Sequence, residues 1–289
     1  MTGANRGTIF LEEGRVQKHF ACPGDQYILR LQAPRCATAA RPGSFVHLRC
    51  DPSLPMRRPF SIMRSSPGDG WIEVLYKVVG RGTALLSKRR EGDGLSCLGP
   101  IGRGFTAIPG KTGALMIGGG VGIPPMIFQA ESLRNKTPGK LLVLMGSEVP
   151  FPFSPVPSRI VTPGIPDGVI AALPVLEEMG IPSRLASLQG YPGCHDGYVT
   201  DLADRWIRVR GHSGDLVVYA CGPHAMLEAV AGLCRRHDIP CQVSLEEFMA
   251  CAVGGCAGCV VKVETADGTA MKRVCVDGPV FDAETVFPA

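Results

Sequence analysis

Short runs of alternating apolar and polar residues fill the first third of the chain, and turn residues separate them. Alternation of this kind is typical of half-buried strands. The turn signals include Pro23-Gly24-Asp25 and Arg41-Pro42-Gly43. Strands are expected over residues 7–17, 26–33, 44–49, 60–64, 71–78 and 94–98. This spacing predicts a closed antiparallel barrel, with one helix over residues 83–90 and Thr83 as its N-cap.

Beyond residue 107 the pattern changes to continuous apolar runs that alternate with segments of helical periodicity. Residues 114–117, 141–145 and 215–220 are expected to form buried strands, and residues 126–135 and 225–235 are expected to form helices. Strands that alternate with helices predict a parallel sheet whose ligand lies at the carboxyl ends of the strands. Residues 149–166 carry many prolines and predict an irregular excursion to which the pattern gives no role.

The composition narrows the class of protein. The chain has 289 residues, of which 45% are hydrophobic and 19% are charged, and its formal net charge is +4. This length and apolar content suffice for two domains with buried cores and a small appendage. The most basic run is Lys88-Arg89-Arg90, so nucleic-acid binding is not indicated.

The start of the chain lacks the apolar segment of a signal peptide. No stretch approaches the roughly 18 consecutive apolar residues of a spanning helix. We therefore expect a cytoplasmic protein with no membrane span. In such a protein, twelve cysteines are better explained as metal ligands and reduced thiols than as disulfides.

Four cysteines near the C-terminus carry the strongest chemical signal. Cys251, Cys256 and Cys259 are separated by four and by two residues, and Cys275 follows sixteen positions after Cys259. This is the ligand arrangement of a [2Fe–2S] cluster. The glycines at 254, 255 and 258 have no Cβ, so the loop can fold tightly and direct backbone N–H groups at sulfur.

Two other interpretations of these cysteines are open. A structural zinc site usually shows two close pairs of ligands, whereas this segment has a single Cys-x2-Cys pair. Burial of all four cysteines as ordinary core residues is the second alternative, since free cysteine is among the most buried residue types. A glycine-rich loop is a poor core element, however. The spacing therefore favours the cluster.

Three motifs in the expected barrel suit a phosphorylated cofactor. In Arg57-Arg58-Pro59-Phe60-Ser61-Ile62, a proline fixes the backbone and an arginine offers a fork that matches a diphosphate. Leu75-Tyr76-Lys77 leads into Gly82 and Thr83, which are expected to open the helix and present free N–H groups to an anion. Leu98-Gly99-Pro100-Ile101-Gly102 predicts a tight loop. Each motif alone has a simpler explanation: an exposed arginine pair for the first, a strand that ends in a turn for the second, and a β-turn for the third. The order of the three motifs along the chain is the stronger evidence.

Bare glycines follow the first strand of the expected parallel sheet. Gly118, Gly119, Gly120 and Gly122 lie between that strand and a Pro-Pro pair that begins the next helix. Glycines at this place let a pyrophosphate approach the backbone at a helix N-terminus. The spacing differs from the G-x-G-x-x-G fingerprint.

Two further features belong to the same edge of the sheet. Cys221-Gly222-Pro223 ends a later strand, so the Cys221 thiol either lies near a nicotinamide or is an ordinary buried thiol. Glu148 follows the second strand, where a carboxylate suits an adenosine ribose and favours NAD over NADP. A solvated surface glutamate explains Glu148 equally well.

An iron–sulfur cluster and a nicotinamide site in one chain need a flavin between them. A cluster moves single electrons, a nicotinamide carries a hydride, and a flavin exchanges with both. The Arg-Pro-Phe-Ser motif is the candidate place for that flavin. Hydride transfer itself needs no acid or base from the protein, so no catalytic residue is assigned.

The order of these motifs resembles the ferredoxin–NADP reductase superfamily: Arg58-Pro59-Phe60-Ser61, then Gly82-Thr83, then the 118–125 loop, then Cys221-Gly222-Pro223. The segment 246–251, the cysteine motif and the 274–281 ending look like the electron-transfer subunit of dihydroorotate dehydrogenase type B. The likeness runs from residue 7 to the C-terminus, and the proline-rich segment 151–166 departs from it.

The resemblance implies a β barrel plus an α/β domain and a small third part. Residues 1–107 would form an FAD-binding antiparallel barrel, residues 108–240 an NAD-binding parallel-sheet domain, and residues 241–289 a [2Fe–2S] module. An FMN-containing catalytic subunit would oxidise dihydroorotate, and electrons would run through the cluster and FAD to NAD⁺. The implied FAD contacts are Arg58, Pro59, Phe60, Ser61, Leu75, Tyr76, Lys77, Gly82 and Thr83; the nicotinamide-side residues are Gly118, Gly119, Gly120, Gly122, Cys221, Gly222 and Pro223; the metal ligands are Cys251, Cys256, Cys259 and Cys275.

Other assignments share these motifs. An NAD(P)H–ferredoxin oxidoreductase subunit or the flavin subunit of a sulfide or sulfite reductase would have the same architecture, and the partner would distinguish them. A non-catalytic redox-sensing iron–sulfur protein is the alternative of another class. A sensor has no need of two nucleotide sites, so it predicts no NADH-dependent dye reduction by the isolated chain.

Overall fold

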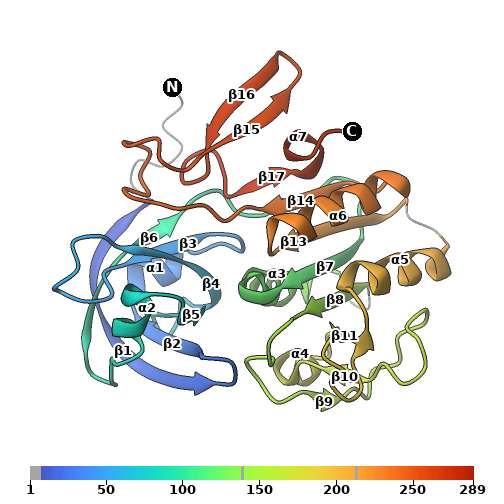
Figure 1. The fold of residues 1–289 in the computed structure, drawn as a ribbon, viewed down its shortest axis with the longest axis horizontal. Helices are drawn as coiled ribbons and strands as arrows, with labels where there is room; N and C mark the ends of the chain where they lie inside the picture. Colours follow the sequence, from blue (N-terminus) through green and yellow to red (C-terminus); the bar gives the residue numbers. More distant parts are fainter. Residues whose placement is uncertain (1–7, 138–139, 212–213) are drawn as a thin grey trace.

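A closed antiparallel barrel of six strands forms the N-terminal part of the computed structural model, which describes residues 8–137, 140–211 and 214–289 (Figure 1). In barrel order the strands are β1 (Phe10–Cys22), β2 (Gln26–Gln32), β5 (Trp71–Lys77), β4 (Arg58–Ser66), β3 (Phe45–Leu48) and β6 (Gly94–Ile101). Alternate residues such as Leu29 and Leu31 of β2 fill one apolar core with Val46 and Ile62. The predicted barrel is confirmed.

Three barrel strands, β1, β4 and β6, extend further than predicted, and β4 covers Arg58–Ser66 instead of residues 60–64. Strand β1 continues past residue 17 to Cys22, because it pairs with β2 as far as Gln26. Its predicted start at Gly7 lies outside the described residues. Residues 98–101, predicted as a loop, are the end of β6. A Cβ on Gly99 would lie 2.8 Å from Cγ1 of Val46, so this glycine is required by packing inside the barrel wall.

Helix α2 (Arg81–Leu86) begins earlier than predicted, and the assignment of Thr83 as its N-cap is wrong. Gly80 is the N-cap, and Thr83 lies three residues further on. The Thr83 Oγ1 atom accepts hydrogen bonds from the N–H groups of Val79 (3.0 Å) and Gly80 (3.2 Å). Thr83 therefore closes the first turn from inside the helix. A short helix α1 (Pro34–Ala39) was not expected.

The second part is a seven-stranded sheet. Its order is β12 (His195–Asp196), β11 (Ser183–Ser187), β8 (Leu141–Gly146), β7 (Gly113–Gly119), β13 (Leu216–Cys221), β14 (Cys241–Ser244) and β17 (Val280–Asp282). Neighbouring strands are parallel except for β17, which pairs antiparallel with β14. The predicted parallel sheet is confirmed, with one antiparallel strand added at its edge.

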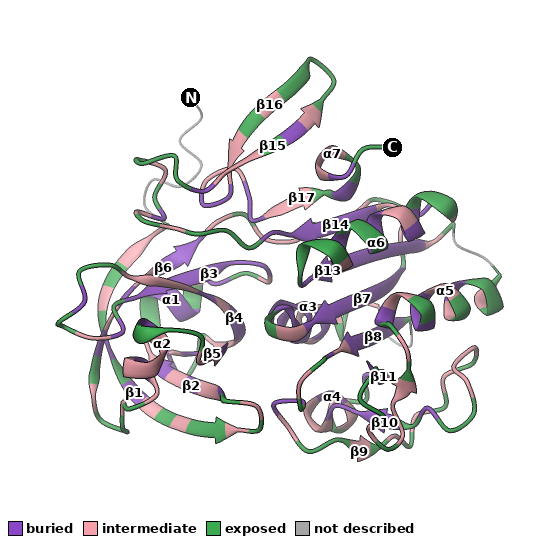
Figure 2. Cartoon of the chain, in the orientation of Figure 1, coloured by how far each residue is buried: buried purple, intermediate pink, exposed green. Residues whose placement is uncertain are grey.

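Helices cover both faces of this sheet, whose central strands are buried (Figure 2). Helix α3 (Ile123–Leu133) packs on the face that holds Met116, and α5 (Val199–Arg210) and α6 (His224–Arg236) pack on the face that holds Ile117. Successive residues of a strand point to opposite faces, so β7 contributes to both cores. Two prolines stand in the first turn of α3, as predicted.

The proline-rich segment follows an irregular path, as predicted. Its strand β9 (Val156–Pro157) pairs with β10 (Ala171–Ala172), which lies beyond the segment and precedes α4 (Pro174–Glu178). Strand β11 was not predicted, because it buries polar residues such as Ser183 and Arg184 and lacks an apolar run. None of the helices in the described ranges is both long and apolar enough to cross a membrane.

The C-terminal segment leaves the sheet and returns to it. After β14 the chain passes through the cysteine loop into a hairpin of β15 (Val260–Thr265) and β16 (Gly268–Arg273), which projects from the body of the molecule (Figure 1). It then returns as β17, and α7 (Ala283–Val286) follows. The predicted third part begins at residue 241, so it includes β14 and β17, although both strands belong to the sheet of the second part.

Candidate functional site

The β15–β16 hairpin brings two of the four C-terminal cysteines together. Cys259 directly precedes β15, and Cys275 follows the end of β16. The N–H group of Val274 donates to the Cys259 carbonyl at 2.9 Å and closes the base of the hairpin. As a result, the two Sγ atoms lie 3.3 Å apart and both residues are buried.

Cys251 and Cys256 form a second pair in the preceding loop. The Cys256 N–H donates to Cys251 Sγ at 3.4 Å, and the Gly258 N–H donates to Cys256 Sγ at the same distance. The prediction that backbone N–H groups of the loop point at sulfur is therefore confirmed. Desolvation opposes ionisation of the Cys251 thiol, but hydrogen bonds from Val253, Cys256 and Gly255 together outweigh it and lower the pKa to about 7.

The buried pair is electrostatically different from the loop pair. Desolvation, followed by the neighbouring Cys259, raises the pKa of Cys275 to about 12. Thiolate is the form that binds metal, and a bound cation removes the proton from a coordinating thiol. The Cys259–Cys275 pair is thus suited to a ligand that supplies strong positive charge.

Two pairs of thiols fit a binuclear cluster better than a single metal ion. Within the described residues, no three His, Cys, Asp or Glu side chains converge on one metal-ion position. A tetrahedral zinc ion needs its ligands around a single point, whereas a [2Fe–2S] cluster can take two thiolates on each iron. Cys251 with Cys256 and Cys259 with Cys275 would each supply two thiolates for such a cluster.

The shape of the cysteine loop depends on fewer glycines than expected. Left-handed backbone occurs at Ala252 (φ 56°), Gly254 (φ 83°) and Ala257 (φ 53°). At Gly254, a Cβ would also lie 2.5 Å from a side-chain carbon of Val276. Gly255 and Gly258 have room for a Cβ. Of the three glycines singled out in the sequence, only Gly254 is required by packing.

Two adjacent arginines at the start of β4 have different surroundings. Arg57 donates to the carbonyl (2.7 Å) and hydroxyl (2.9 Å) of Ser96 and is engaged within the barrel. Arg58 donates only to carbonyl oxygens of its own segment. Its side chain lies against α2, where a Cβ on Gly82 would come within 3.1 Å of Arg58 Nε. The structure therefore brings Arg58 beside Gly82 and Thr83, with guanidinium donors left for an anion.

Tyr76 belongs to a buried aromatic group. Its ring stacks on Tyr27 with centroids 5.5 Å apart, and Phe60 meets it edge-on at the same distance. The His19 Nδ1 atom lies 2.8 Å from the Arg89 carbonyl, and His19 Nε2 lies 2.8 Å from the Tyr76 hydroxyl. A carbonyl only accepts, so His19 Nδ1 donates to Arg89, and in the neutral ring the Tyr76 hydroxyl then donates to Nε2.

This burial changes what the predicted flavin residues can contribute. Desolvation raises the pKa of Tyr76, so its hydroxyl stays neutral. Phe60, Leu75 and Tyr76 are all buried in apolar cores, so their side chains are engaged in packing within the protein. Ser61 and Lys77 are half-buried and keep polar side chains for contact.

The glycines after β7 serve two different purposes. A Cβ at Gly122 would overlap the carbonyl of Cys221, and a Cβ at Gly119 would overlap Sδ of Met226. These two glycines allow the β7–α3 turn to pack against the β13–α6 turn. Gly120 has left-handed backbone (φ 54°) and nothing within 4 Å of its Cβ position. Gly120 is therefore the place where a pyrophosphate can approach the backbone.

A pair of glycine variants separates these purposes. We expect Gly122→Ala to destabilise the fold by about 3 kcal/mol, because the added Cβ overlaps backbone that cannot move aside. We expect Gly120→Ala to cost only about 1 kcal/mol through its left-handed backbone and to weaken NAD binding instead. Urea unfolding followed by circular dichroism measures the stabilities. Equal destabilisation by the two variants would contradict the packing role of Gly122.

Cys221 lies next to Gly118 at the carboxyl edge of the sheet and is fully buried. Desolvation is the main reason that the pKa of its thiol is raised, and the charge of Glu246 adds to it. Desolvation also raises the pKa of the Glu246 carboxyl. Glu246 was not a predicted site residue. Its place two residues after the end of β14, the strand that pairs with β13, was a signal that could have found it. Glu148 is exposed just past β8 on the same edge.

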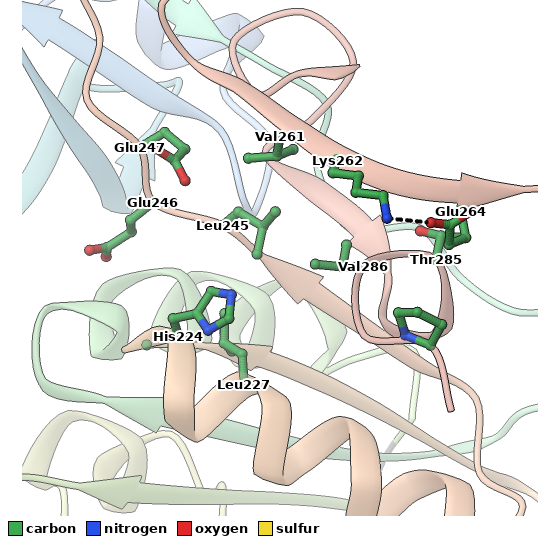
Figure 3. A pocket seen from close by; sticks show the side chains of 12 residues that line it. His224, Leu227, Leu245, Glu246, Glu247, Val261, Lys262, Glu264, Thr285 and Val286 are labelled. Atoms are coloured by element: carbon green, nitrogen blue, oxygen red, sulfur yellow. Dashed lines mark ion pairs between the residues drawn. The ribbon is translucent and has the colours of Figure 1, made fainter. Parts of the chain in front are cut away.

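A hollow of about 510 Å³ separates this edge from the cysteine module (Figure 3). Its walls come from the start of α6, the linker after β14, β15 and the C-terminal residues. Glu246 and Glu247 point to opposite sides of that linker (Figure 3), and Lys262 is paired with Glu264 at 3.1 Å. The lining thus has three carboxylates and one lysine, whose ammonium group is already paired. This excess of negative charge disfavours binding of a phosphate in the hollow. A dinucleotide pyrophosphate is therefore expected on the Gly120 side of the sheet.

A family comparison agrees with the geometry of the cysteine module. Residues 246–287 match the iron–sulfur cluster binding domain of dihydroorotate dehydrogenase B. This segment contains all four cysteines and the β15–β16 hairpin.

Relatives cover nearly the whole chain. It is 35% identical over 260 residues to the "Dihydroorotate dehydrogenase B (NAD(+)), electron transfer subunit" of Desulforamulus reducens, which covers 88% of this chain and 90% of that one. It is 36% identical over 268 residues to the protein of the same name from Geobacillus kaustophilus, with 90% and 92% covered.

Solved structures agree on the fold. An NADH-dependent reduced ferredoxin–NADP oxidoreductase matches with a TM-score of 0.75 at 26% identity, over 99% of this chain and 91% of that one. Phthalate dioxygenase reductase matches with a TM-score of 0.58 at 15% identity, over 94% and 78%, which shows a shared fold. The predicted combination of a reductase body and an iron–sulfur module is confirmed.

Proposed function

This chain belongs to the family of dihydroorotate dehydrogenase B electron transfer subunits, and we propose that it carries electrons from a dihydroorotate-oxidising partner subunit to NAD⁺. One observation carries this proposal: the domain that contains the two cysteine pairs is joined, in one chain, to a barrel and a sheet with the reductase fold. The relatives' names favour this function over the other reductases and over a sensor.

Three groups supply the redox chemistry: the cluster relays single electrons, FAD converts between single electrons and hydride, and NAD⁺ accepts the hydride. The residues of the chain position these groups. The four cysteines hold the cluster. Arg58, which lies beside Gly82 at the start of α2, would hold the FAD diphosphate, and residues 59–61 and 75–77 would contact the FAD.

The nucleotide edge of the sheet receives NAD. Gly120 leaves open backbone for the pyrophosphate, and Glu148 is placed to bind the adenosine ribose. The turn of Cys221, Gly222 and Pro223 bounds the nicotinamide end beside Gly118, Gly119 and Gly122. Residues 1–107, 108–240 and 241–289 then carry FAD, NAD and the cluster respectively, although β14 and β17 tie the last two parts through one sheet.

The FMN-containing partner docks beside the cysteine loop in this proposal. Cys256 is exposed there, and the side chains of Phe248 (93% exposed) and Val253 (51%) stand free on either side of Cys251. Large exposed apolar side chains of this kind are typical interface anchors. None of the twelve cysteines, which all lie in the described residues, forms a disulfide, which supports the cytoplasm as the compartment.

Purification of the chain under anaerobic conditions with the protein that accompanies it in its own cells tests this function. We expect that protein to contain FMN and the complex to form NADH from dihydroorotate and NAD⁺, followed by absorbance at 340 nm. The isolated chain should reduce dyes with NADH but should not oxidise dihydroorotate. A co-purifying partner that lacks FMN, or a complex inactive with dihydroorotate, would refute the proposal.

A further inference from the structure

The proline-rich segment encloses a second hollow, which the proposed electron path does not use. It has a volume of about 240 Å³ and is lined by residues 158–162, residues 165–170 and Arg184 of β11. The segment is held against α5, because a Cβ on Gly164 would lie 3.2 Å from Val209 and 3.3 Å from the Trp206 ring. The turn between Thr162 and Ile165, which both line the hollow, is therefore packed against α5.

Arg184 is a buried cation without an acidic partner. It is only 5% exposed, and its two Nη atoms each donate at 2.7 Å to a carbonyl, of Ser183 and of Ile160. Its Nε atom is buried and has no hydrogen-bond partner. None of the ion pairs formed among the described residues includes Arg184. Buried charges are normally paired, so this guanidinium lacks its usual compensation.

Glu177, the acid whose charge acts on Arg184, is committed elsewhere. The two carboxylate oxygens of Glu177 accept hydrogen bonds from the Ser158 hydroxyl (2.9 Å) and the Arg159 N–H (2.6 Å). Desolvation lowers the pKa of Arg184, and the charge of Glu177 only partly offsets this. Arg159 adds a second cation to the lining, and the exposed Asp167 is the acid that lines the hollow.

We propose that this hollow binds a small anion with a phosphate or carboxylate group, and that Arg184 is its principal ligand. A guanidinium presents a planar fork of donors that matches either group. Thr162 adds a hydroxyl to the lining whose contact with the Ile160 carbonyl is long (3.4 Å), whereas the Ser158 hydroxyl already donates to Glu177. The site is separate from the NAD site, because Arg184 is near the amino end of β11 whereas dinucleotides bind at the carboxyl ends of parallel strands.

Trp206 offers a probe close to the hollow, because its ring packs on Gly164, which lies between the lining residues Thr162 and Ile165. The chain has two tryptophans, so a Trp71→Phe background leaves only the ring that packs on Gly164. We expect the fluorescence of this full-length protein, with FAD bound, to change saturably with inorganic phosphate, with succinate or with both at constant ionic strength. Sodium chloride alone should give no change, and the anion that saturates identifies the preferred group. No saturable response to either anion would overturn the proposal.

Two variants test the role of Arg184. Arg184→Met should weaken the response at least about tenfold, the loss expected for one charged hydrogen bond, whereas Asp167→Asn should leave it unchanged or strengthen it. If Arg184→Met does not fold, Thr162→Val and Arg159→Met should each weaken binding. A response of wild-type strength in Arg184→Met, or in both substitute variants, would overturn the assignment. The titration measures anion binding and involves no electron transfer, so its result does not depend on whether the proposed function is correct.

Discussion

The Cys256→Ser variant is expected to lose the [2Fe–2S] cluster while it keeps bound FAD and NADH-dependent dye reduction. Cys256 is the exposed member of the loop pair, and its sulfur accepts the Gly258 N–H. A serine hydroxyl ionises far less readily than a thiol and is a poor ligand for iron at neutral pH. The residues proposed for FAD and NAD lie in other segments, so those sites should remain filled. Dihydroorotate-dependent reduction of NAD⁺ by the complex should fall to background.

Iron and sulfide content, the electron paramagnetic resonance spectrum of the reduced protein, and flavin content measure the three outcomes separately. Cys22→Ser is the matched control, because Cys22 is a half-buried thiol at the end of β1 that belongs to neither cysteine pair. It should change none of these quantities. Loss of flavin together with the cluster in Cys256→Ser would contradict the division of the chain into three cofactor-bearing parts.

The sequence predicted the barrel well because strands such as β1 and β2 turn one face to the barrel core, which produces alternation, although β3 is buried at every position. The same rule was available for the β15–β16 hairpin, where Val261 and Val263 alternate with Lys262 and Glu264, but it was not applied there. Strand β11 offered no such signal, because Arg184 is buried as a polar residue. Its environment is set by the distant carbonyl of Ile160, which no local pattern encodes.

For the site, the spacing of the cysteines predicted the ligands but could not predict their pairing. The pairing comes from the register of the hairpin, in which Val260 lies opposite Arg273 and brings Cys259 to Cys275. The arginine pair shows the same limit. Adjacent residues in a strand point to opposite sides, so Arg57 and Arg58 were chemically equal in the sequence and differ only after the barrel closes.

That difference makes Arg58→Ala the second variant with a large expected effect. Arg57 is satisfied by Ser96, whereas Arg58 lies against Gly82 with donors free. A charged hydrogen bond contributes about 1.5–3 kcal/mol, so FAD should bind roughly 10- to 100-fold more weakly in Arg58→Ala. Dye reduction should fall on dilution and recover when FAD is added, and the cluster signal should persist. Equilibrium dialysis of the flavin measures the affinity.

Two control variants show whether the effect is local. Arg57→Ala should lower the thermal midpoint by breaking bonds within the barrel and should leave flavin affinity near that of the wild type. Arg58→Lys should fall between Arg58→Ala and the wild type, because an ammonium keeps the charge but loses the fork that matches a diphosphate. Unchanged flavin occupancy in Arg58→Ala would remove this arginine from the diphosphate site. Equal flavin loss in Arg57→Ala would mean that barrel integrity, rather than a direct contact, retains the cofactor.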